Sequence, residues 1–354
     1  MRKIIHISFI SMFIIMISLP LILMVAGVKS SLTLDENRNL EQLKFSELKP
    51  SNVVEKVENY INDHFGLRAE LIYLGRLQVL KMDAHLDQKV LIGKEGWLFY
   101  KDDNGLNDYR NTKPYSIEEL EHIYKKIVSY VQKSNDLGAR FILMIPPNAL
   151  TIYGQRYAPD WIEKLNESSR LDQLKKYLQE RKIEIADSRE ILKAKIDKEQ
   201  LYFKTDTHWT MIGAYFGYYN LMEKLFLEPK PLVEFRRVKK VQDFFDLTKM
   251  LGPMPIREEY IELEPLEGWK SKPNTSMSEN RKHKYYSCLD CGNHTALVIH
   301  DSFMGNMLGF LNEHFQSVHY VKDNQIDWEL VQKEKPDYLI LELVERKTYS
   351  WVPK

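Results

Sequence analysis

The sequence is poor in cysteine and carries no net charge. Cys288 and Cys291 are the only cysteines among 354 residues, and fifty basic side chains balance fifty acidic ones. We also find no basic stripe with interleaved aromatic residues, so we expect no nucleic-acid partner. The remaining composition, 44% hydrophobic and 28% charged, is that of a globular protein with enough apolar residues for a core.

Metal and cofactor motifs are missing as well. A structural zinc site usually brings a second pair of ligands at matching spacing, whereas here only His283 and His294 lie near the cysteines. We therefore predict no metal site, and either a local disulfide or two free thiols at Cys288 and Cys291. The glycines of residues 90–100 do not have the spacing of a phosphate-binding loop, and we predict no cofactor.

Only one segment is long and apolar enough to cross a membrane. Residues 4–28 contain no Asp, Glu, Lys or Arg and follow Arg2 and Lys3. As a helix this run would be about 37 Å long, more than a hydrocarbon core of about 30 Å requires. A cleaved signal has a shorter apolar region and an A-x-A-like exit, which VAGVKSS matches poorly. We favour an uncleaved anchor over a removed signal, with the body outside the cytoplasm because the basic N-terminus stays inside.

The sequence divides into three segments. Residues 1–30 form the expected membrane anchor, and residues 31–60 read as a polar stalk that leads into a helix. Residues 61–354 form the main domain. Within it, residues 229–294 are charged, rich in proline and poor in periodicity, so we expect an irregular insertion rather than a second domain.

Short apolar strands alternate with amphipathic helices in the main domain. Wholly apolar strands of this kind predict an α/β fold, with a parallel sheet covered by helices on both faces. Ligands of such sheets bind outside the carboxyl ends of the strands. The strand at residues 141–145 leads to Asn148, and the strand that ends at His300 leads to Asp301 and Ser302.

Ser302 occupies a strand-to-helix turn. A serine there projects its hydroxyl at the edge of the sheet, and amides at the start of the helix can stabilise an oxyanion. The alternative is an N-cap, for which serine is a preferred residue. His300 is a rival base, but neighbouring residues at a strand end point in different directions, so we interpret His300 as structural.

The stretch FKTDTHWT, residues 203–210, places an acid two residues before a histidine. A serine nucleophile needs a base, and the base needs a carboxylate that fixes its tautomer. Asp206 and His208 can supply both. In the alternative, Asp206 or Thr207 caps the following helix and His208 packs against Trp209. Metal binding by the pair would need further ligands, and none is obvious.

Six segments, in order along the chain, give the sequence a resemblance to one family. They are NDHFGLR (62–68), LIGKEGWLFY (91–100), FILMIPPNALTIY (141–153), DTHW (206–209), DSF (301–303) and LELVER (341–346). The chain resembles the SGNH-hydrolase-like domain of the alginate O-acetyltransferase family, which includes related cell-wall polysaccharide O-acetyltransferases. DTHW followed by DSF is the most specific part. The resemblance implies an SGNH-hydrolase-like (flavodoxin-like) parallel sheet behind the N-terminal transmembrane helix.

The resemblance also implies a chemistry. Ser302, His208 and Asp206 correspond to the family's Ser-His-Asp triad, with the acid and base before the nucleophile. The implied enzyme is a single-pass membrane protein that moves an acetyl group, through an acetyl-serine intermediate, onto a cell-surface or cell-wall polysaccharide. The Ser302 amide and the Asn148 side chain are oxyanion candidates, with turn capping as the alternative for Asn148. Trp209 is a candidate for stacking on a sugar ring, with core packing as the alternative.

Topology adds a partner. Acetyl-CoA is cytosolic, so an external enzyme of this family implies an integral membrane-bound O-acyltransferase that supplies the acetyl group. Two other functions stay open: an esterase of the same fold that uses water as acceptor, and a non-catalytic polysaccharide-binding or assembly protein. The complete set of Asp206, His208 and Ser302 argues against the latter. His300 departs from the family pattern, because many relatives have glycine there, and this puts close backbone packing at that position in question.

Overall fold

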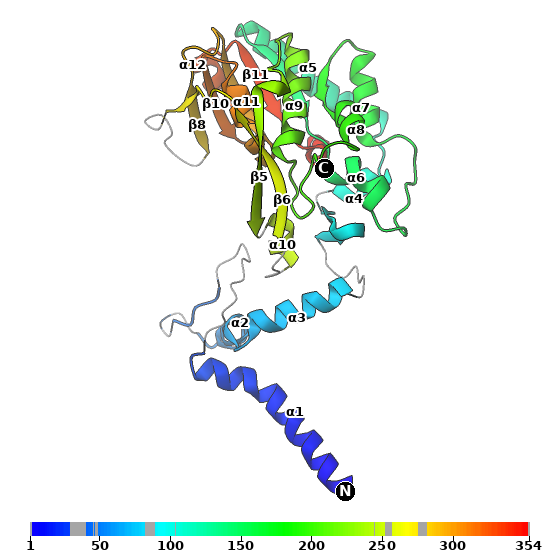
Figure 1. The fold of residues 1–354 in the computed structure, drawn as a ribbon, viewed down its shortest axis with the longest axis vertical. Helices are drawn as coiled ribbons and strands as arrows, with labels where there is room; N and C mark the ends of the chain where they lie inside the picture. Colours follow the sequence, from blue (N-terminus) through cyan, green and yellow to red (C-terminus); the bar gives the residue numbers. More distant parts are fainter. Residues whose placement is uncertain are drawn as a thin grey trace. The chain divides into compact units, whose positions relative to one another are not determined.

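The structure is a computed structural model that describes residues 2–28, 40–44, 46, 49–81, 89–102, 104–243, 245–251, 257–274 and 282–352. Residues 31–39 of the predicted stalk lie outside these ranges. The chain divides into two compact units (Figure 1). One unit comprises residues 1–87 and 243–256, and the other comprises residues 88–242 and 257–354.

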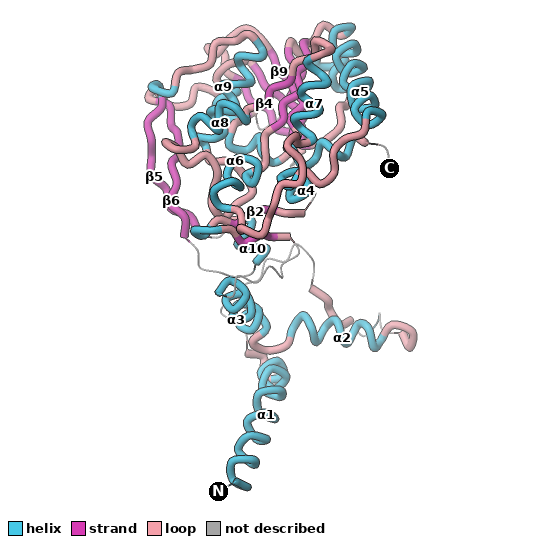
Figure 2. The backbone as a smooth tube through the Cα atoms, turned by 90° about the vertical axis from the view of Figure 1, so that its right-hand side faces the viewer, coloured by secondary structure: helices cyan, strands magenta, loops and turns pink. Residues whose placement is uncertain are grey.

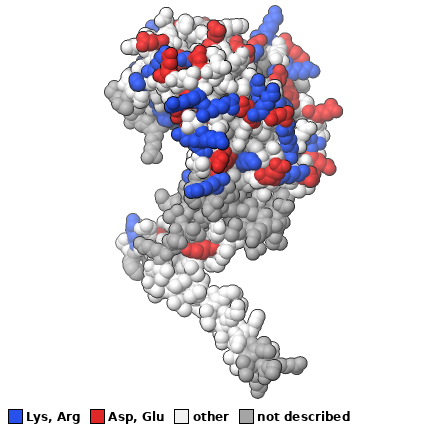
Figure 3. Space-filling model, viewed as in Figure 1, with Lys and Arg blue, Asp and Glu red and all other residues white. Residues whose placement is uncertain are grey.

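The first unit is helical where the structure describes it. Its helices are α1 (Arg2–Val25), α2 (Val53–His64), α3 (Arg68–Lys81) and α10 (Asp246–Leu251). Within α1, residues His6–Val25 are long and apolar enough to cross a membrane, and none of this span is buried. Figure 3 shows the described part of α1 without charged side chains. Length and composition of α1 therefore fit the predicted anchor.

The second unit is built on a seven-stranded sheet in the order β4-β3-β11-β9-β10-β8-β7. The strands are β3 (Arg140–Ile145), β4 (Ile185–Asp187), β7 (Lys272–Pro273), β8 (His283–Ser287), β9 (Thr295–His300), β10 (Ser317–Lys322) and β11 (Tyr338–Glu342). In this order, each neighbouring pair of strands from β4 across to β10 is parallel. The strand β8 pairs antiparallel with both β10 and β7. The predicted parallel sheet is confirmed, and an antiparallel edge extends it.

Helices cover both faces of the sheet (Figure 2). On one face lie α5 (Ile117–Asp136), α7 (Arg170–Gln179) and α12 (Trp328–Glu334), and on the other lie α4 (Gly105–Arg110), α6 (Ala149–Tyr157), α8 (Arg189–Lys195), α9 (Met211–Leu225) and α11 (Leu308–Asn312). Alternating β3 side chains belong to different cores: Met144 packs with α6 and α9, and Leu143 packs with α5 and α7. Both faces are buried, which explains why β3 is wholly apolar at its centre.

A short hairpin precedes the main sheet along the chain, and in this hairpin β1 (Val90–Ile92) pairs antiparallel with β2 (Leu98–Tyr100). The segment 229–294 differs from expectation, because its described residues are not irregular. They include β5 (Phe235–Asp243) and β6 (Arg257–Pro265), which form a two-stranded sheet, as well as β7 and β8 of the main sheet. These strands are mostly exposed or half-buried, so their charged sequence lacks the apolar runs that reveal buried strands.

A disulfide joins Cys288 and Cys291 in the connection between β8 and β9. Their Cα atoms lie 5.3 Å apart. Of the two states that the sequence left open for these cysteines, the structure has the disulfide.

Candidate active site

The acid–base turn, defined here as residues 203–210, is closed by pairing between its two ends. Tyr202 and Trp209 form an antiparallel bridge, and the Thr210 amide donates to the Leu201 carbonyl at 2.9 Å. The helix α9 begins directly after the turn, and Thr210 is its N-cap because Thr210 Oγ1 accepts from Gly213 N at 3.3 Å. Capping is therefore carried out by Thr210, and the interpretation of Asp206 or Thr207 as the helix cap is wrong.

A buried carboxylate from β6 holds the start of this turn. Glu258 Oε1 accepts from the Lys204 amide and from the Gln200 side chain, both at 2.7 Å. Glu258 Oε2 accepts from the Thr205 amide at 3.1 Å and from the Thr205 hydroxyl at 2.7 Å. The side chain is almost fully enclosed, so these four hydrogen bonds replace its hydration. The backbone immediately before Asp206 is thereby fixed to the insertion.

The nucleophile turn follows β9. Asp301 caps the 3₁₀ helix Ser302–Asn306 by accepting from Phe303 N at 3.0 Å, and its second oxygen accepts from Val344 N at 3.0 Å. Because Asp301 does the capping, the proposed alternative of Ser302 as N-cap is wrong. The Ser302 side chain is exposed at the carboxyl end of the parallel strands.

Trp209 joins the two turns. Its ring nitrogen donates to the Phe303 carbonyl at 2.9 Å, and Asn306 Nδ2 donates to the Trp209 carbonyl at 2.7 Å. The side chain is fully buried, and a Cβ added at Gly217 would lie 2.7 Å from the indole ring. No face of the indole is open to a ligand, so Trp209 is a core residue and the stacking candidate is withdrawn.

The three predicted site residues lie in hydrogen-bond contact. His208 Nδ1 is 2.6 Å from Asp206 Oδ1, and His208 Nε2 is 2.8 Å from Ser302 Oγ. Asp206 Oδ1 also accepts from the His208 amide at 2.9 Å. A carboxylate can only accept, so the Nδ1 atom carries a proton and the Nε2 atom of the neutral ring is the acceptor for the serine hydroxyl. These distances are those of a direct proton transfer.

Two buried acids, Asp301 and Glu342, support the nucleophile turn, and their pKa values are shifted in opposite directions. Burial opposes ionisation of Asp301, but the Lys347 ammonium at 3.2 Å and the amides of Phe303 and Val344 lower the pKa of Asp301 overall. Burial, together with the charge of Asp301, raises the pKa of Glu342 well above its ordinary value. Glu342 Oε2 accepts from the Asp301 amide at 2.9 Å. The environment thus favours the charged form of Asp301, which anchors the nucleophile turn, and disfavours the charged form of Glu342.

Asn148 follows β3, which only β11 separates from β9. Two strand spacings amount to about 10 Å, so Asn148 and Ser302 belong to the same edge of the sheet. The backbone N–H of Asn148 donates to Glu345 Oε2 at 2.8 Å, and the side-chain Oδ1 atom of Asn148 accepts from Arg346 at 3.0 Å. The buried Nδ2 atom has no hydrogen-bond partner among the described residues, and the side chain does not cap α6.

Two further residues complete the surroundings. The Arg346 guanidinium lies 5.4 Å from the centre of the Phe303 ring and so connects Asn148 to the nucleophile turn. His300 is buried, its Nδ1 atom lies 2.5 Å from the Asp301 carbonyl oxygen, and its ring meets the edge of Tyr320. Burial lowers the pKa of His300. This environment agrees with the structural interpretation of His300.

Comparisons with solved structures support the fold. Bacillus cereus PatB1 with a sulfonyl adduct matches with a TM-score of 0.54 and 15% identity over 73% of this chain and 97% of that chain. Another PatB1 structure from Bacillus cereus matches with a TM-score of 0.52 and 13% identity over 75% and 97%. A DHHW family protein from Eubacterium siraeum matches with a TM-score of 0.50 and 15% identity over 75% and 96%.

Family membership follows from the sequence comparison. No curated protein matches the chain. A family model described as "SGNH hydrolase-like domain, acetyltransferase AlgX" matches residues 90–318, which is more than half of the chain and includes Asp206, His208 and Ser302. The chain therefore belongs to the family of SGNH hydrolase-like acetyltransferase domains of the AlgX type.

Proposed function

We propose that this protein is a membrane-anchored, extracytoplasmic O-acetyltransferase that acetylates a hydroxyl group of a cell-surface or cell-wall polysaccharide. The observation that carries the proposal is the hydrogen-bonded series from Asp206 through His208 to the exposed Ser302. A purely structural serine would be expected to cap its helix, and here Asp301 has that role. Family membership supports acetyl transfer as the reaction.

In the first half-reaction, Ser302 Oγ attacks the carbonyl carbon of an acetyl ester while its proton moves to His208 Nε2. Asp206 stabilises the imidazolium that forms and keeps its Nδ1 proton in place. The tetrahedral intermediate then collapses: the ester bond breaks, and the leaving alcohol takes the proton from His208. The product is an acetyl-serine at position 302.

In the second half-reaction, a sugar hydroxyl attacks the acetyl-serine and gives its proton to His208. Collapse releases the acetylated sugar and returns the proton to Ser302 Oγ. The oxyanion of each step needs donors, for which we propose the Ser302 amide and the Nδ2 atom of Asn148. Support for Asn148 comes from its buried Nδ2 atom, which lacks a partner among the described residues, at the edge where Ser302 lies.

We infer the location from α1. A span at His6–Val25 behind Arg2 and Lys3 would leave the second unit outside the cytoplasm. Acetyl-CoA is not available there, so we propose that an integral membrane-bound O-acyltransferase delivers the acetyl group. A multi-spanning acyltransferase encoded beside this protein would support that partner.

The test uses the full chain in lipid vesicles with an activated acetyl ester, with and without a panel of surface-polysaccharide oligosaccharides. We expect acetylated oligosaccharide by mass spectrometry and an acetyl group on the peptide that contains Ser302. The Ser302→Ala variant should lose at least about a thousandfold in rate. Ser287→Ala, which changes an exposed serine of β8, is the matched control and should keep full rate.

The same assay separates the two enzyme classes. Release of acetate at a rate that no oligosaccharide changes, with no acetylated sugar, would favour the esterase. Unchanged polysaccharide acetylation in cells that carry Ser302→Ala would favour the non-catalytic binding protein. Either result would end the transferase proposal.

A further inference from the structure

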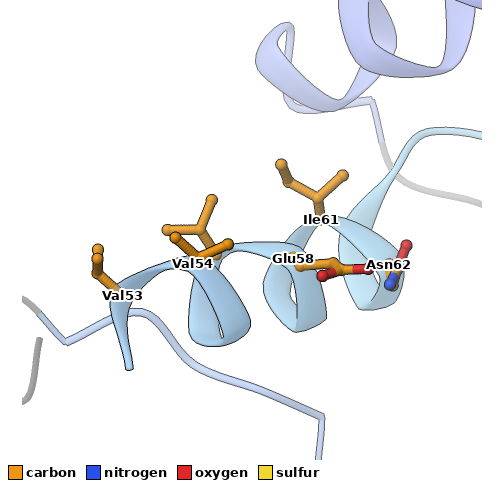
Figure 4. A pocket seen from close by; sticks show the side chains of 6 residues that line it. Val53, Val54, Glu58, Ile61 and Asn62 are labelled. Atoms are coloured by element: carbon orange, nitrogen blue, oxygen red, sulfur yellow. The ribbon is translucent and has the colours of Figure 1, made fainter. Parts of the chain in front are cut away.

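One apolar surface of the first unit has no place in the proposed chemistry. In α2, Val53, Val57 and Ile61 recur at every fourth position, and Val54 lies beside them, 75% exposed. We refer to these four side chains as the apolar face of α2. With Glu58 and Asn62 at its border, this face lines an apolar groove of about 420 Å³ (Figure 4). Figure 4 shows Val54 and Ile61 on the same side of the helix.

The opposite side of α2 is polar. It carries Glu55, Lys56, Asn59 and Asp63, so the helix is amphipathic along its full length. Over the whole helix three acids, Glu55, Glu58 and Asp63, outnumber the single lysine. This negative charge gives α2 no electrostatic attraction to anionic lipids. Any lipid that it contacts must therefore be held by the apolar face, which zwitterionic lipid can satisfy.

The end of α2 is attached to the candidate membrane span. The Gly66 amide, two residues beyond α2, donates to the Pro20 carbonyl of α1 at 2.9 Å. A Cβ at Gly66 would lie 2.5 Å from Leu23 Cβ and 2.7 Å from Pro20 O, so only glycine permits this approach. The corner between α2 and α3 thus packs against α1 itself.

This contact sets the depth of α2. Pro20 lies five residues before Val25, where the apolar span ends, which corresponds to about 8 Å along the helix axis. Amphipathic helices that lie on membranes bury their apolar face about 5–10 Å into the boundary between headgroups and acyl chains. With Val25 at the membrane boundary, the attachment point of α2 would lie at the depth that an interfacial helix occupies.

We propose that α2 is an interfacial helix whose apolar face lies in the outer surface of the bilayer that α1 crosses. Because α1 holds α2 beside the membrane, the helix needs no separate recruitment step. The inference rests on the proposed anchoring by α1 but not on acetyl transfer. It gives the enzyme a second, lateral contact with lipid, next to the span.

The experiment compares two labelled forms of the full chain in phosphatidylcholine vesicles. The two native cysteines form a disulfide, so one introduced thiol gives one labelled site. Val54→Cys probes the apolar face, and Asn59→Cys, at an exposed position on the opposite, polar side of the same helix, is the matched control. Each is labelled with a nitrobenzoxadiazole fluorophore. Quenching is then measured with aqueous iodide and with lipids that carry a nitroxide near the headgroup.

For the label at position 54 we expect a blue-shifted emission and at least about twofold stronger quenching by lipid-borne nitroxide than at position 59, with iodide giving the opposite order. Equal quenching at both positions would overturn the proposal. Protection at position 54 that disappears as the protein is diluted in lipid would mean self-association instead, and would overturn it as well. Flotation of the vesicles after alkaline carbonate treatment tests α1 separately, so a failed anchor is distinguished from a failed interfacial helix.

Discussion

The carboxylate of Glu258 offers the sharpest test of how the acid–base turn is held. Replacement by glutamine keeps the shape of the side chain but changes one acceptor oxygen into an NH₂ donor. All four groups that contact Glu258 are donors: the Lys204 amide, the Gln200 side chain, and the amide and hydroxyl of Thr205. Only two of them can keep an acceptor in the Glu258→Gln variant.

The structure gives a magnitude for this change. The less costly orientation turns the new NH₂ group toward Thr205, whose hydroxyl can rotate and accept. The buried Thr205 amide then faces a donor and loses its partner, which costs about 1–3 kcal/mol. The loosened turn misplaces His208 relative to Ser302. If about 1.4–2 kcal/mol of the loss is thereby added to the activation free energy, kcat falls about tenfold to thirtyfold. KM should change little, because Glu258 is buried behind the turn.

The assay is steady-state acetyl release from an activated ester, run well below the unfolding temperature of each variant. Glu259→Gln is the control, since it removes the same charge from the next residue, which is exposed. If Glu258→Gln matches Glu259→Gln in both kcat and unfolding temperature, this carboxylate does not hold the turn and the reasoning is refuted.

Three further predictions concern other parts of the second unit. Asp206→Asn should lower kcat by about 10³–10⁴-fold with KM nearly unchanged in the same assay, because the tautomer of His208 is no longer fixed; a loss below tenfold would contradict the triad. Burial, with help from the Lys230 charge, lowers the pKa of His314 from 6.5 to about 4. As the pH falls, His314 is therefore protonated in the unfolded chain before it is protonated in the folded one. Its contribution to the free energy of unfolding is fully present above pH 6.5 and falls by up to about 3 kcal/mol as the pH drops toward 4. Denaturant unfolding across this range should show a shallower loss in His314→Gln, and equal slopes would contradict the assignment. Replacing both cysteines by serine opens a loop of four residues, which should cost about 2 kcal/mol in the same unfolding measurement, and no change would mean that the closed loop adds nothing.

Much of the fold could be predicted from local patterns. The strand β3 is apolar because it is buried on both faces, and the capping box at Ser116 and Glu119 marks the start of α5. The rule that ligands bind at the carboxyl ends of parallel strands identifies Asn148 and Ser302 from the sequence pattern alone. The contact between His208 and Ser302 spans 94 positions of sequence, and the expectation that they meet came from family resemblance rather than from spacing.

Other features left no local signal. Glu258 belongs to a charged segment, and its partners lie more than fifty positions earlier in the chain, so nothing in REEYIELEP distinguishes it from the exposed Glu259. The strands of this segment are largely exposed, which removes the apolar periodicity that identifies buried strands. The role of Trp209 depends on its burial and on the Phe303 carbonyl, and neither is a property of the DTHW sequence.

In both turns of the site, one residue caps the following helix and another contacts His208. Each precedes a helix, and each sequence places several good capping residues side by side: Asp206, Thr207 and Thr210 in one, Asp301 and Ser302 in the other. In the structure the caps are Thr210 and Asp301, and this choice leaves Asp206 and Ser302 with side chains that bond His208. Because all these residues are good caps, the sequence alone cannot tell which of them the backbone uses. Long-range contacts decide which residue caps each helix. Glu258 fixes the backbone before Asp206, and the Val344 amide fixes the carboxylate of Asp301, which precedes Ser302.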